Sequence, residues 1–400
     1  MEHSLSCYRC GSIYTERTRQ RCDCGEPLWF DTPVNSDLLS LSASIDSIWT
    51  YQDLLPVAQP RSGIAASVGA TPLHRLAALD SIGPAIYLKN EGLHPTGSFK
   101  DRGSAVGVTA AVEHGVSAIG TVSHGNMAMS TAACAAGTEL DCYVFVPDDI
   151  PPERLYNIGQ FGPTIVRVSG SYGALYEKSL ELEQTHDITF VNSDSPLRTA
   201  GQKTTGLEIA HEFVQNKALP DAPDAIVLPV SSGGHASATW KGLRELAEAG
   251  LIETVPRLYF VQAAACAPIA RAYTNGASTA TALSPDDVGE TIAYSIANAD
   301  PPSGTRALTA ARETGGSVLA VTDKDIHAAR NQLARRGGIS VESACATTLA
   351  ATEQLVEIGE LNTTDHVVLV GTGSGFKEQR TGDIATVEAS VEALETVLKH

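Results

Sequence analysis

The sequence predicts an α/β fold of two three-layer αβα domains with mainly parallel sheets, preceded by a small cysteine-bearing segment. The chain has 400 residues, more than one hydrophobic core usually holds. Short apolar runs alternate with longer Ala-rich or amphipathic stretches, which is the pattern of strands and helices in a parallel sheet. Four of the eight cysteines fall within the first 24 residues, ahead of that alternation.

The predicted strands are short apolar runs bounded by turn-forming residues. In chain order they cover residues 85–89, 118–123, 142–146, 165–168, 188–192, 225–230, 258–262, 318–321 and 366–370. The helices predicted between them include residues 126–136, 171–184, 203–215, 236–249, 323–337 and 344–359. Ligands of parallel sheets bind beyond the carboxyl ends of the strands, so the turns that follow strands are where we expect functional residues.

The charge balance limits the classes of partner. The chain has 28 Lys and Arg residues against 46 Asp and Glu, a net charge of −18, which disfavours binding to nucleic acid and anionic membranes. Only nine of the basic residues are lysine, and an acidic, lysine-poor surface suggests a halophilic source. No apolar run is long enough to span a bilayer and no secretory pattern opens the chain, so we expect a cytoplasmic protein.

The N-terminal cysteines predict a small zinc ribbon. Cys7 and Cys10 are separated by two residues, and Cys22 and Cys24 by one. Paired cysteines of this kind supply the thiolates of structural zinc sites. The second pair is one residue shorter than usual, so incomplete ligation or a vestigial site is the alternative. The other cysteines, predicted to be buried small hydrophobes without a role, are Cys134, Cys142, Cys266 and Cys345.

Lys100 is the predicted catalytic residue. It lies in the run PTGSFKDRG (95–103), where a loop rich in Pro and Gly meets a helix-like segment. A lysine amine becomes a nucleophile when a dry pocket or a cationic neighbour lowers its pKa, and such a lysine commonly holds pyridoxal phosphate as a Schiff base. Arg102 fits the role of that neighbour. The alternative is a solvated lysine at the start of a helix.

Three turns after predicted strands fit the same cofactor. Asn126 could hold a phenolic oxygen, with a helix N-cap as the alternative. Thr372, within the glycine-rich turn 371–375, could bond a pyridine nitrogen without charge, which favours elimination or replacement over transamination; a plain glycine turn is the alternative. A phosphate cradle at the start of a helix is predicted from Ser231, Ser232, Gly233, Gly234 and His235.

A further anion site is predicted after the strand 188–192. Asn192, Ser193 and Arg198 bring amide, hydroxyl and guanidinium groups together ahead of the segment 201–204, which opens a helix. The alternative is ordinary helix capping by Ser195 or Thr204 with a solvated Arg198.

Together these motifs resemble threonine synthase, in the fold type II family of pyridoxal-phosphate enzymes. The nine-residue run around Lys100 looks like the lysine motif of threonine synthases and implies that Lys100 forms the Schiff base. The resemblance implies that Asn126 contacts the ring oxygen and Thr372 the pyridine nitrogen. It also implies that Asn192, Ser193 and Arg198 grip a substrate phosphate, that Ser123 helps to hold the substrate, and that the cofactor is pyridoxal 5'-phosphate with a possible structural zinc.

The resemblance implies a zinc-ribbon-like segment at residues 1–32, a large cofactor-binding domain at 33–95 and 190–400, and a small substrate-closing domain at 96–189. It implies a homodimer as well. Several positions near the substrate depart from the family pattern: Met127 stands where Thr is usual, His124 replaces Ser, the phosphate loop lacks both its amides, and Ala297 stands where an arginine is expected.

The expected reaction is conversion of O-phospho-L-homoserine and water to L-threonine and phosphate. One alternative is another pyridoxal-phosphate-dependent β- or γ-elimination or replacement, of the serine/threonine dehydratase or sulfur-transfer synthase type. The other is a homologue that binds the cofactor or an amino acid without turnover. Met127 and Ala297 favour a different amino acid as substrate, whereas Arg198 favours a phosphorylated one.

Overall fold

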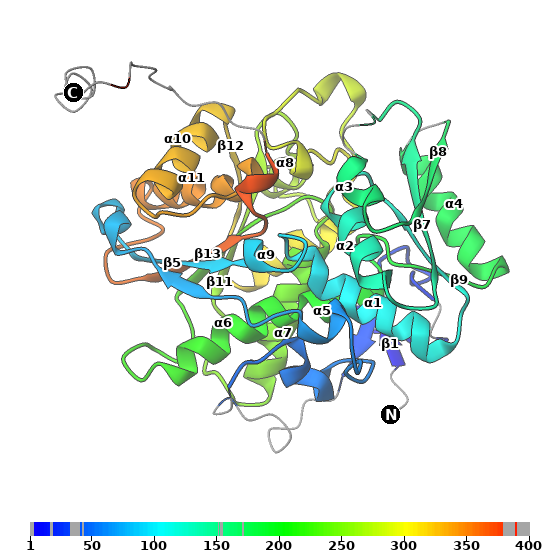
Figure 1. Ribbon diagram of the computed structural model, residues 1–400. Helices are drawn as coiled ribbons and strands as arrows, with labels where there is room; N and C mark the ends of the chain where they lie inside the picture. Colours follow the sequence, from blue (N-terminus) through cyan, green and yellow to red (C-terminus); the bar gives the residue numbers. More distant parts are fainter. Residues whose placement is uncertain are drawn as a thin grey trace.

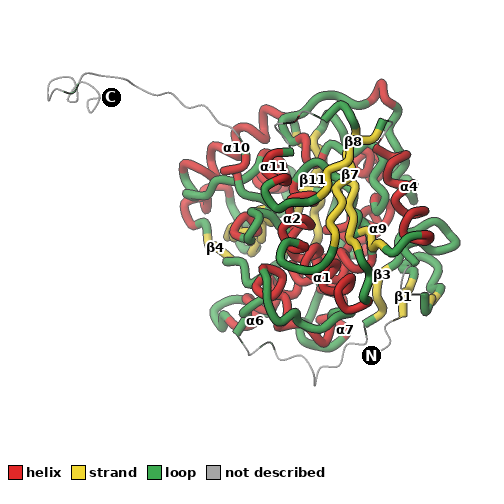
Figure 2. Tube along the Cα trace, turned by 45° about the vertical axis from the view of Figure 1, so that its right-hand side comes forward, coloured by secondary structure: helices red, strands yellow, loops and turns green. Residues whose placement is uncertain are grey.

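The structure, a computed structural model, describes residues 4–16, 19–32, 41, 44–150, 152, 155–169, 172–378 and 389. It confirms the predicted α/β fold (Figure 1). The described residues form sheets of six, four and three strands, and Figure 2 shows strands in the middle of the molecule with helices around them, while the short N-terminal strands lie at its edge. Within these ranges, none of the helices is long and apolar enough to cross a membrane.

The six-stranded sheet has the order β12-β11-β10-β13-β5-β4, and all neighbours are parallel except the edge pair β4 and β5. Its central strands are continuous apolar runs because helices cover both of their faces. The strand bounds are β4 Leu73–Arg75, β5 Ala85–Asn90, β10 Ala225–Pro229, β11 Arg257–Ala263, β12 Val318–Val321 and β13 His366–Gly371.

Alternate residues of these strands pack into two separate cores. Ile226 and Leu228 of β10 face one group of helices, α6 Thr204–Gln215, α7 Gly234–Glu248, α8 Pro268–Thr274 and α9 Gly304–Glu313. Val227 faces the opposite group, α10 Asp323–Arg335 and α11 Ser343–Glu357. This period of two produces the three-layer arrangement of helices, sheet and helices.

The four-stranded sheet is parallel throughout, with the order β8-β7-β6-β9. Its strands are β6 Ala118–Val122, β7 Asp141–Pro147, β8 Thr164–Val168 and β9 Ile188–Phe190. The helices of this region are α1 Lys100–His114, α2 Asn126–Ala135, α3 Tyr156–Gly159 and α4 Tyr172–Thr185, and α5 Pro196–Gln202 follows β9. Helix α1 packs along α5 and α2, so the lysine-bearing helix joins the two larger sheets.

The N-terminal sheet is antiparallel, with the order β2-β1-β3 and the bounds β1 Ser4–Ser6, β2 Ile13–Tyr14 and β3 Trp29–Asp31. It docks on the large sheet's helices through Trp29, whose ring lies 5.8 Å from that of Trp240 in α7. The short 3-10 helices are η1 Ile48–Leu54, η2 Ile64–Ser67, η3 Ala77–Ile82, η4 Glu91–Leu93, η6 Pro285–Asp287, η7 Tyr294–Ile296 and η8 Gly375–Lys377.

Every predicted strand is present, and the predicted ends lie within two residues of the observed ones. The predicted helices are present too, although residue 171, the expected start of α4, lies outside the described residues. The sequence did not predict α8 and α9, nor the edge strand β4. The domain boundaries at 33, 96 and 190 stay a prediction.

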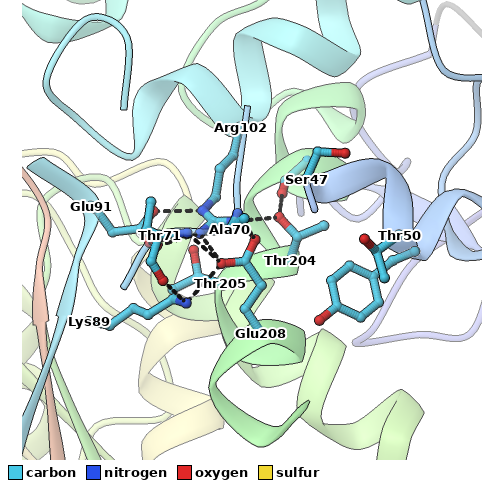
Figure 3. A network of polar contacts seen from close by, with 12 residues as sticks. Ser47, Thr50, Ala70, Thr71, Lys89, Glu91, Arg102, Thr204, Thr205 and Glu208 are labelled. Atoms are coloured by element: carbon cyan, nitrogen blue, oxygen red, sulfur yellow. Dashed lines mark hydrogen bonds and ion pairs between the residues drawn. The ribbon is translucent and has the colours of Figure 1, made fainter. Parts of the chain in front are cut away.

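A buried ion-pair network anchors the start of α1 (Figure 3). Arg102 donates from Nε to Glu91 at 2.6 Å and from Nη1 to Glu208 at 2.6 Å. Lys89 Nζ lies 2.8 Å from the other oxygen of Glu208, and all four side chains are fully buried. The network therefore connects α1 to β5, to the turn after β5 and to α6.

The network holds the carboxylates in their charged form. Burial opposes ionisation of Glu208, yet the charges of Arg102 and Lys89 lower the pKa of its carboxyl to about 2. Because this folded-state pKa is depressed, ionised Glu208 stabilises the fold above its ordinary pKa. That contribution is lost as the pH falls through the folded value.

Replacing Glu208 by Gln should lower the free energy of unfolding by about 3–5 kcal/mol, since it leaves two buried cations with one fewer anion. Urea denaturation measures the change. The matched control is Glu181→Gln in the exposed pair with Lys178, where a loss of about 0–1 kcal/mol is expected. Equal losses in the two variants would contradict the anchoring role of the network.

Candidate active site

A cavity of about 900 Å³ opens at the carboxyl ends of strands from both larger sheets. Its wall is built by the turns after β6, β10 and β13, by the segment 294–300 and by the residues that precede α11. This is the place where parallel α/β sheets bind ligands. The predicted residues that line it are Lys100, Ser123, Asn126, Ser193, Ser231, Ser232, Gly233, His235 and Thr372.

Lys100 is the first residue of α1, and its half-buried side chain lines the cavity, which argues against the alternative of a fully solvated lysine. Its Nζ lies 4.4 Å from the ring centre of Phe99. Burial lowers the pKa of Lys100 to about 7, with help from the positive charges of Arg198 and Lys377 and against the pull of Glu342. A substantial fraction of this amine is therefore uncharged and nucleophilic near neutral pH.

The cationic neighbour is Arg198 rather than Arg102, which corrects the expectation from sequence. The guanidinium of Arg102 turns away into the network with Glu91 and Glu208, which neutralise its charge. Arg198, from α5, is instead the largest electrostatic cause of the lowered pKa of Lys100 after burial. Sequence adjacency suggested Arg102, but the packing of α5 along α1 decides which cation faces the amine.

Asn126 begins α2, and the N-cap position is Gly125, so the N-cap alternative is wrong for its side chain. Its Nδ2 donates to both oxygens of Glu342, at 2.9 and 3.0 Å. Its Oδ1 accepts from Lys377 Nζ at 2.7 Å. The Asn126 amide therefore lies in the cavity wall, with its nitrogen bonded to Glu342 and its oxygen bonded to Lys377.

The predicted phosphate cradle is a tight turn between β10 and α7. Gly233 has φ of +86°, and a Cβ there would lie 2.3 Å from the carbonyl oxygen of Ser303. A Cβ on Gly234 would lie 2.4 Å from the carbonyl oxygen of Ser193. Only glycine fits both positions, and the turn brings the N-terminus of α7 to the cavity, where its dipole favours an anion.

His235 gives this turn a hydrogen-bond donor. Its ring stacks on Phe99 with centres 4.0 Å apart, and Nε2 lies 2.9 Å from the Thr205 hydroxyl. Burial lowers the pKa of His235 to about 3, so the ring is neutral at physiological pH. Nδ1 is buried without a partner among the described residues. If Thr205 donates to Nε2, the Nδ1 proton is left for an anion, which fits a phosphate group.

Thr372 follows β13 and is nine-tenths buried in the wall. Its carbonyl accepts from Phe99 N at 3.0 Å, which ties the lysine loop to this turn. Its hydroxyl lies 3.1 Å from Cys345 Sγ, and Gly373 N donates to the same sulfur at 3.1 Å. Cys345, predicted to have no role, therefore supports the turn. An uncharged hydroxyl here fits a pyridine nitrogen, so the wall as a whole fits pyridoxal phosphate.

The predicted substrate residues fall into two groups, because Ser123 and Ser193 line the cavity whereas Asn192 and Arg198 lie behind its wall. Asn192 is fully buried; its Oδ1 accepts from Val122 N at 3.0 Å and its Nδ2 donates to Ser179 at 2.7 Å. These bonds join the end of β6 to α4, which gives Asn192 a structural role.

Arg198 is fully buried, and its Nη1 donates to Ser104 at 3.3 Å and to the Val191 carbonyl at 3.4 Å. The alternative with a solvated Arg198 is therefore wrong, although Ser195 does cap α5 by accepting from Arg198 N at 3.4 Å. Although Arg198 does not line the cavity, its positive charge acts on Lys100 and lowers the pKa of that amine.

The sequence reasoning missed Glu342, Lys377 and Gln202 as site residues. Glu342 and Gln202 line the cavity, and Lys377 contacts Asn126 behind it. The oxygen of the Gln202 amide is buried without a partner among the described residues. Gln202 had a signal, because it stands in the segment 201–204 that was assigned to anion binding as a whole. Glu342 and Lys377 had no such signal in the sequence, because isolated charged residues beside helices are common.

The four N-terminal cysteines come together. All four sulfur atoms lie within 4.8 Å of one another. The separations are 3.6 Å for Cys7 and Cys24, 3.4 Å for Cys10 and Cys22, and 3.8 Å for Cys10 and Cys24. A tetrahedral zinc with bonds of about 2.3 Å has sulfur atoms about 3.8 Å apart, so the donor set fits a structural zinc ion.

The lowered pKa of Lys100 should be visible in its reactivity. Competitive acetylation of the full-length, cofactor-free chain with acetic anhydride, followed by peptide mass spectrometry, should give a rate for Lys100 that rises with pH and reaches its half-maximum near pH 7. The exposed Lys178 serves as the reference for reagent reactivity. A half-maximum near pH 10 would contradict the dry, positively charged environment.

Comparisons with known proteins agree with this site. The family model described as pyridoxal-phosphate dependent enzyme matches residues 64–373. Threonine synthase of Methanosarcina acetivorans is 33% identical over 98% of both chains, and that of Mycobacterium tuberculosis is 35% identical over 84% of this chain and 89% of its own. Among solved structures, maize serine racemase superposes with a TM-score of 0.67 at 20% identity, covering 90% of this chain and 97% of its own.

Serine racemase from Dictyostelium discoideum superposes with a TM-score of 0.63 at 24% identity, covering 76% of this chain and 92% of its own. These structural likenesses show the fold, and the longer sequence matches show the family. The chain belongs to the pyridoxal-phosphate-dependent enzymes of fold type II and, within them, to the threonine synthase family.

Proposed function

We propose that this enzyme converts O-phospho-L-homoserine and water to L-threonine and phosphate. The observation that carries the proposal is a lysine with a pKa of about 7 in a cavity that is also lined by a glycine turn at a helix N-terminus. Near full-length similarity to threonine synthases supports the choice of reaction.

The residues of the wall divide the work of holding the cofactor. Lys100 would bind its aldehyde, Asn126 its ring oxygen and Thr372 its pyridine nitrogen. The turn 231–235 would hold its phosphate through backbone N–H groups and His235. When bound, pyridoxal phosphate supplies an electron sink for negative charge at the substrate carbons. The Lys100 amine would take protons from Cα and Cβ of the substrate and return protons to Cγ and Cα, so that phosphate leaves Cγ, Cγ becomes the methyl group and water adds its hydroxyl at Cβ.

The substrate would be held by uncharged hydrogen-bond donors of the cavity wall, with a buried cation nearby. Ser123 and Ser193 line the cavity, and we propose that their hydroxyl groups contact the substrate. Arg198 is fully buried outside the cavity lining and would support the binding of a substrate phosphate through its charge. Asn192 would act indirectly by fixing the end of β6.

Purified protein supplied with pyridoxal phosphate and O-phospho-L-homoserine should release threonine and phosphate in equal amounts, and Lys100→Ala should abolish turnover because the reacting amine is lost. Phosphate release and amino-acid analysis provide the measurements, at low and molar potassium chloride. The control is Lys178→Met, which removes an exposed lysine that is not among the residues lining the cavity. Cofactor binding without release of phosphate would refute this substrate.

One observation favours a second candidate function. The two departures from the family pattern that place an apolar residue where a polar one is usual, Met127 and Ala297, both line the cavity. A wall with fewer polar groups suits dehydration of serine or threonine, or a sulfur-transfer reaction. Release of a 2-oxo acid from serine or threonine, without phosphate chemistry, would identify it.

We further propose that Cys7, Cys10, Cys22 and Cys24 hold a structural zinc ion. The clustering of their sulfur atoms supports this, as does the docking of the ribbon on α7, which a closed metal site would stiffen. The predicted homodimer, the halophilic character and the cytoplasmic location stay predictions.

The purified protein should contain about one zinc per chain, and Cys22→Ser should remove most of it because three thiolates bind less tightly than four. Atomic emission spectrometry measures the metal. The control is Cys142→Ser, a cysteine outside the cluster. Protein grown with added zinc that contains none, or a Cys22→Ser variant with full zinc content, would rule the site out.

A further inference from the structure

The segment 373–378, which begins within the turn 371–375, runs between the lysine loop and the start of α11. Ser374 N donates to the Gly97 carbonyl at 2.9 Å, and Gly375 N donates to the Ser340 carbonyl at 3.1 Å. Glu342 N donates to the Gly373 carbonyl at 3.0 Å. Backbone bonds therefore hold this segment against both elements that carry the active-site charges.

Lys377, on this segment, reaches the buried side of the active site. Its chain passes over Gly97, where a Cβ would lie 3.4 Å from Lys377 Cε. The ammonium group is 2.7 Å from Asn126 Oδ1 and 3.1 Å from Glu342 Oε1. Glycine at position 97, with φ of +75°, leaves room for this path.

Glu342 is held as firmly from its own side. It is 7% exposed, and a Cβ on Gly373 would lie 2.5 Å from its Oε2, so the carboxylate packs on the bare backbone of the turn. The next residue, Ser343, donates from its backbone N and from its hydroxyl to Glu378, both at 2.9 Å. Lys377 and Glu378 thus fix two consecutive residues at the start of α11.

The amide of Asn126 is oriented by this arrangement. Its donor end faces the Glu342 carboxylate and its acceptor end faces the Lys377 ammonium, so the opposite orientation would place like partners together. Asn126 belongs to the four-stranded sheet's helix α2, whereas Glu342 and Lys377 belong to the large sheet's side. The contact therefore also ties the two parts together at the cavity.

We propose that Lys377 and Glu342 form a positioning pair for the active site, which orients the Asn126 amide and presents opposite charges to the Lys100 amine. The proposal rests on the proposed cofactor role of Lys100 and does not depend on the amino-acid substrate. Lys377 and Glu342 are positioning residues and not catalytic residues, because each acts through Asn126 or Lys100.

The charges that face Lys100 come from several elements. Arg198 of α5 and Lys377 lower the pKa of Lys100, whereas Glu342 raises it. His235 of α7 is neutral, because burial lowers its pKa to about 3. On α1 itself, Arg102 is neutralised by its buried partners, and Asp101 turns back to accept from Thr96 N at 2.8 Å. Removing the charge of Lys377 should therefore raise the pKa of Lys100, and removing the charge of Glu342 should lower it.

The test is the pH dependence of cofactor loading. Full-length protein stripped of cofactor is mixed with pyridoxal phosphate, and attachment to Lys100 is followed by absorbance and by mass spectrometry after borohydride trapping. Attachment requires the uncharged amine, so its rate rises with the deprotonated fraction. Lys377→Met should move the midpoint upward by on the order of one pH unit, and Glu342→Gln should move it downward. Lys377→Arg should stay near the native midpoint.

Lys178→Met, which removes an exposed lysine, is the matched control and should leave the midpoint unchanged. Midpoints that coincide with the native one, or that shift in the same direction for Lys377→Met and Glu342→Gln, would overturn the proposal. If Lys377→Met fails to fold, as judged by circular dichroism, the isosteric Glu342→Gln variant decides alone: a downward shift supports the pair and no shift overturns it. Loading needs no amino acid, so failure to form threonine leaves this result independent.

Discussion

The buried ion pairs of Arg102 are the constraint on which the active site depends. Arg102 stands two residues after Lys100, and its bonds to Glu91 and Glu208 fix the first turn of α1 against the turn after β5 and against α6. A buried charge without its partners is costly, so this turn has one low-energy position. The position of the Lys100 amine in the cavity follows from that of the turn.

The same network explains why the charge of Arg102, although close in sequence, has little influence on the pKa of Lys100. The positive charge of Arg102 is compensated by two carboxylates, so it adds little to the field at the amine. Arg198 and Lys377 remain as the cations that disfavour a charged Lys100, and Glu342 is the anion that opposes them. The pKa of about 7 is therefore a balance between burial and three charges on three different elements.

Much of this arrangement could be predicted because it is local in sequence. The turn 231–235 and Thr372 each follow a strand with a clear apolar pattern, and parallel strands bring such turns to one edge of a sheet. The contacts of Asn126 could not be predicted in this way. Its partners Glu342 and Lys377 are 216 and 251 residues away, and no local period identifies them. The prediction for Arg198 failed for a different reason. Its position in the sequence correctly placed it near the cavity, but the packing of α5 on α1 buries its side chain.

Under the proposed function, the substrate and the cofactor would be held by different kinds of group. Among the described residues of the wall, the only lysine or arginine besides Lys100 is Arg21, and Arg21 is paired with buried Asp194. Under the proposed function, a substrate phosphate would be met by neutral groups such as Ser123, Ser193 and Gln202, and Arg198, which is buried outside the cavity lining, would contribute its charge from the interior. Such donors recognise the shape of a phosphate and leave charge compensation to the interior. Because Arg21 and Gly25 line the cavity, the N-terminal cysteine-bearing segment also forms part of its wall.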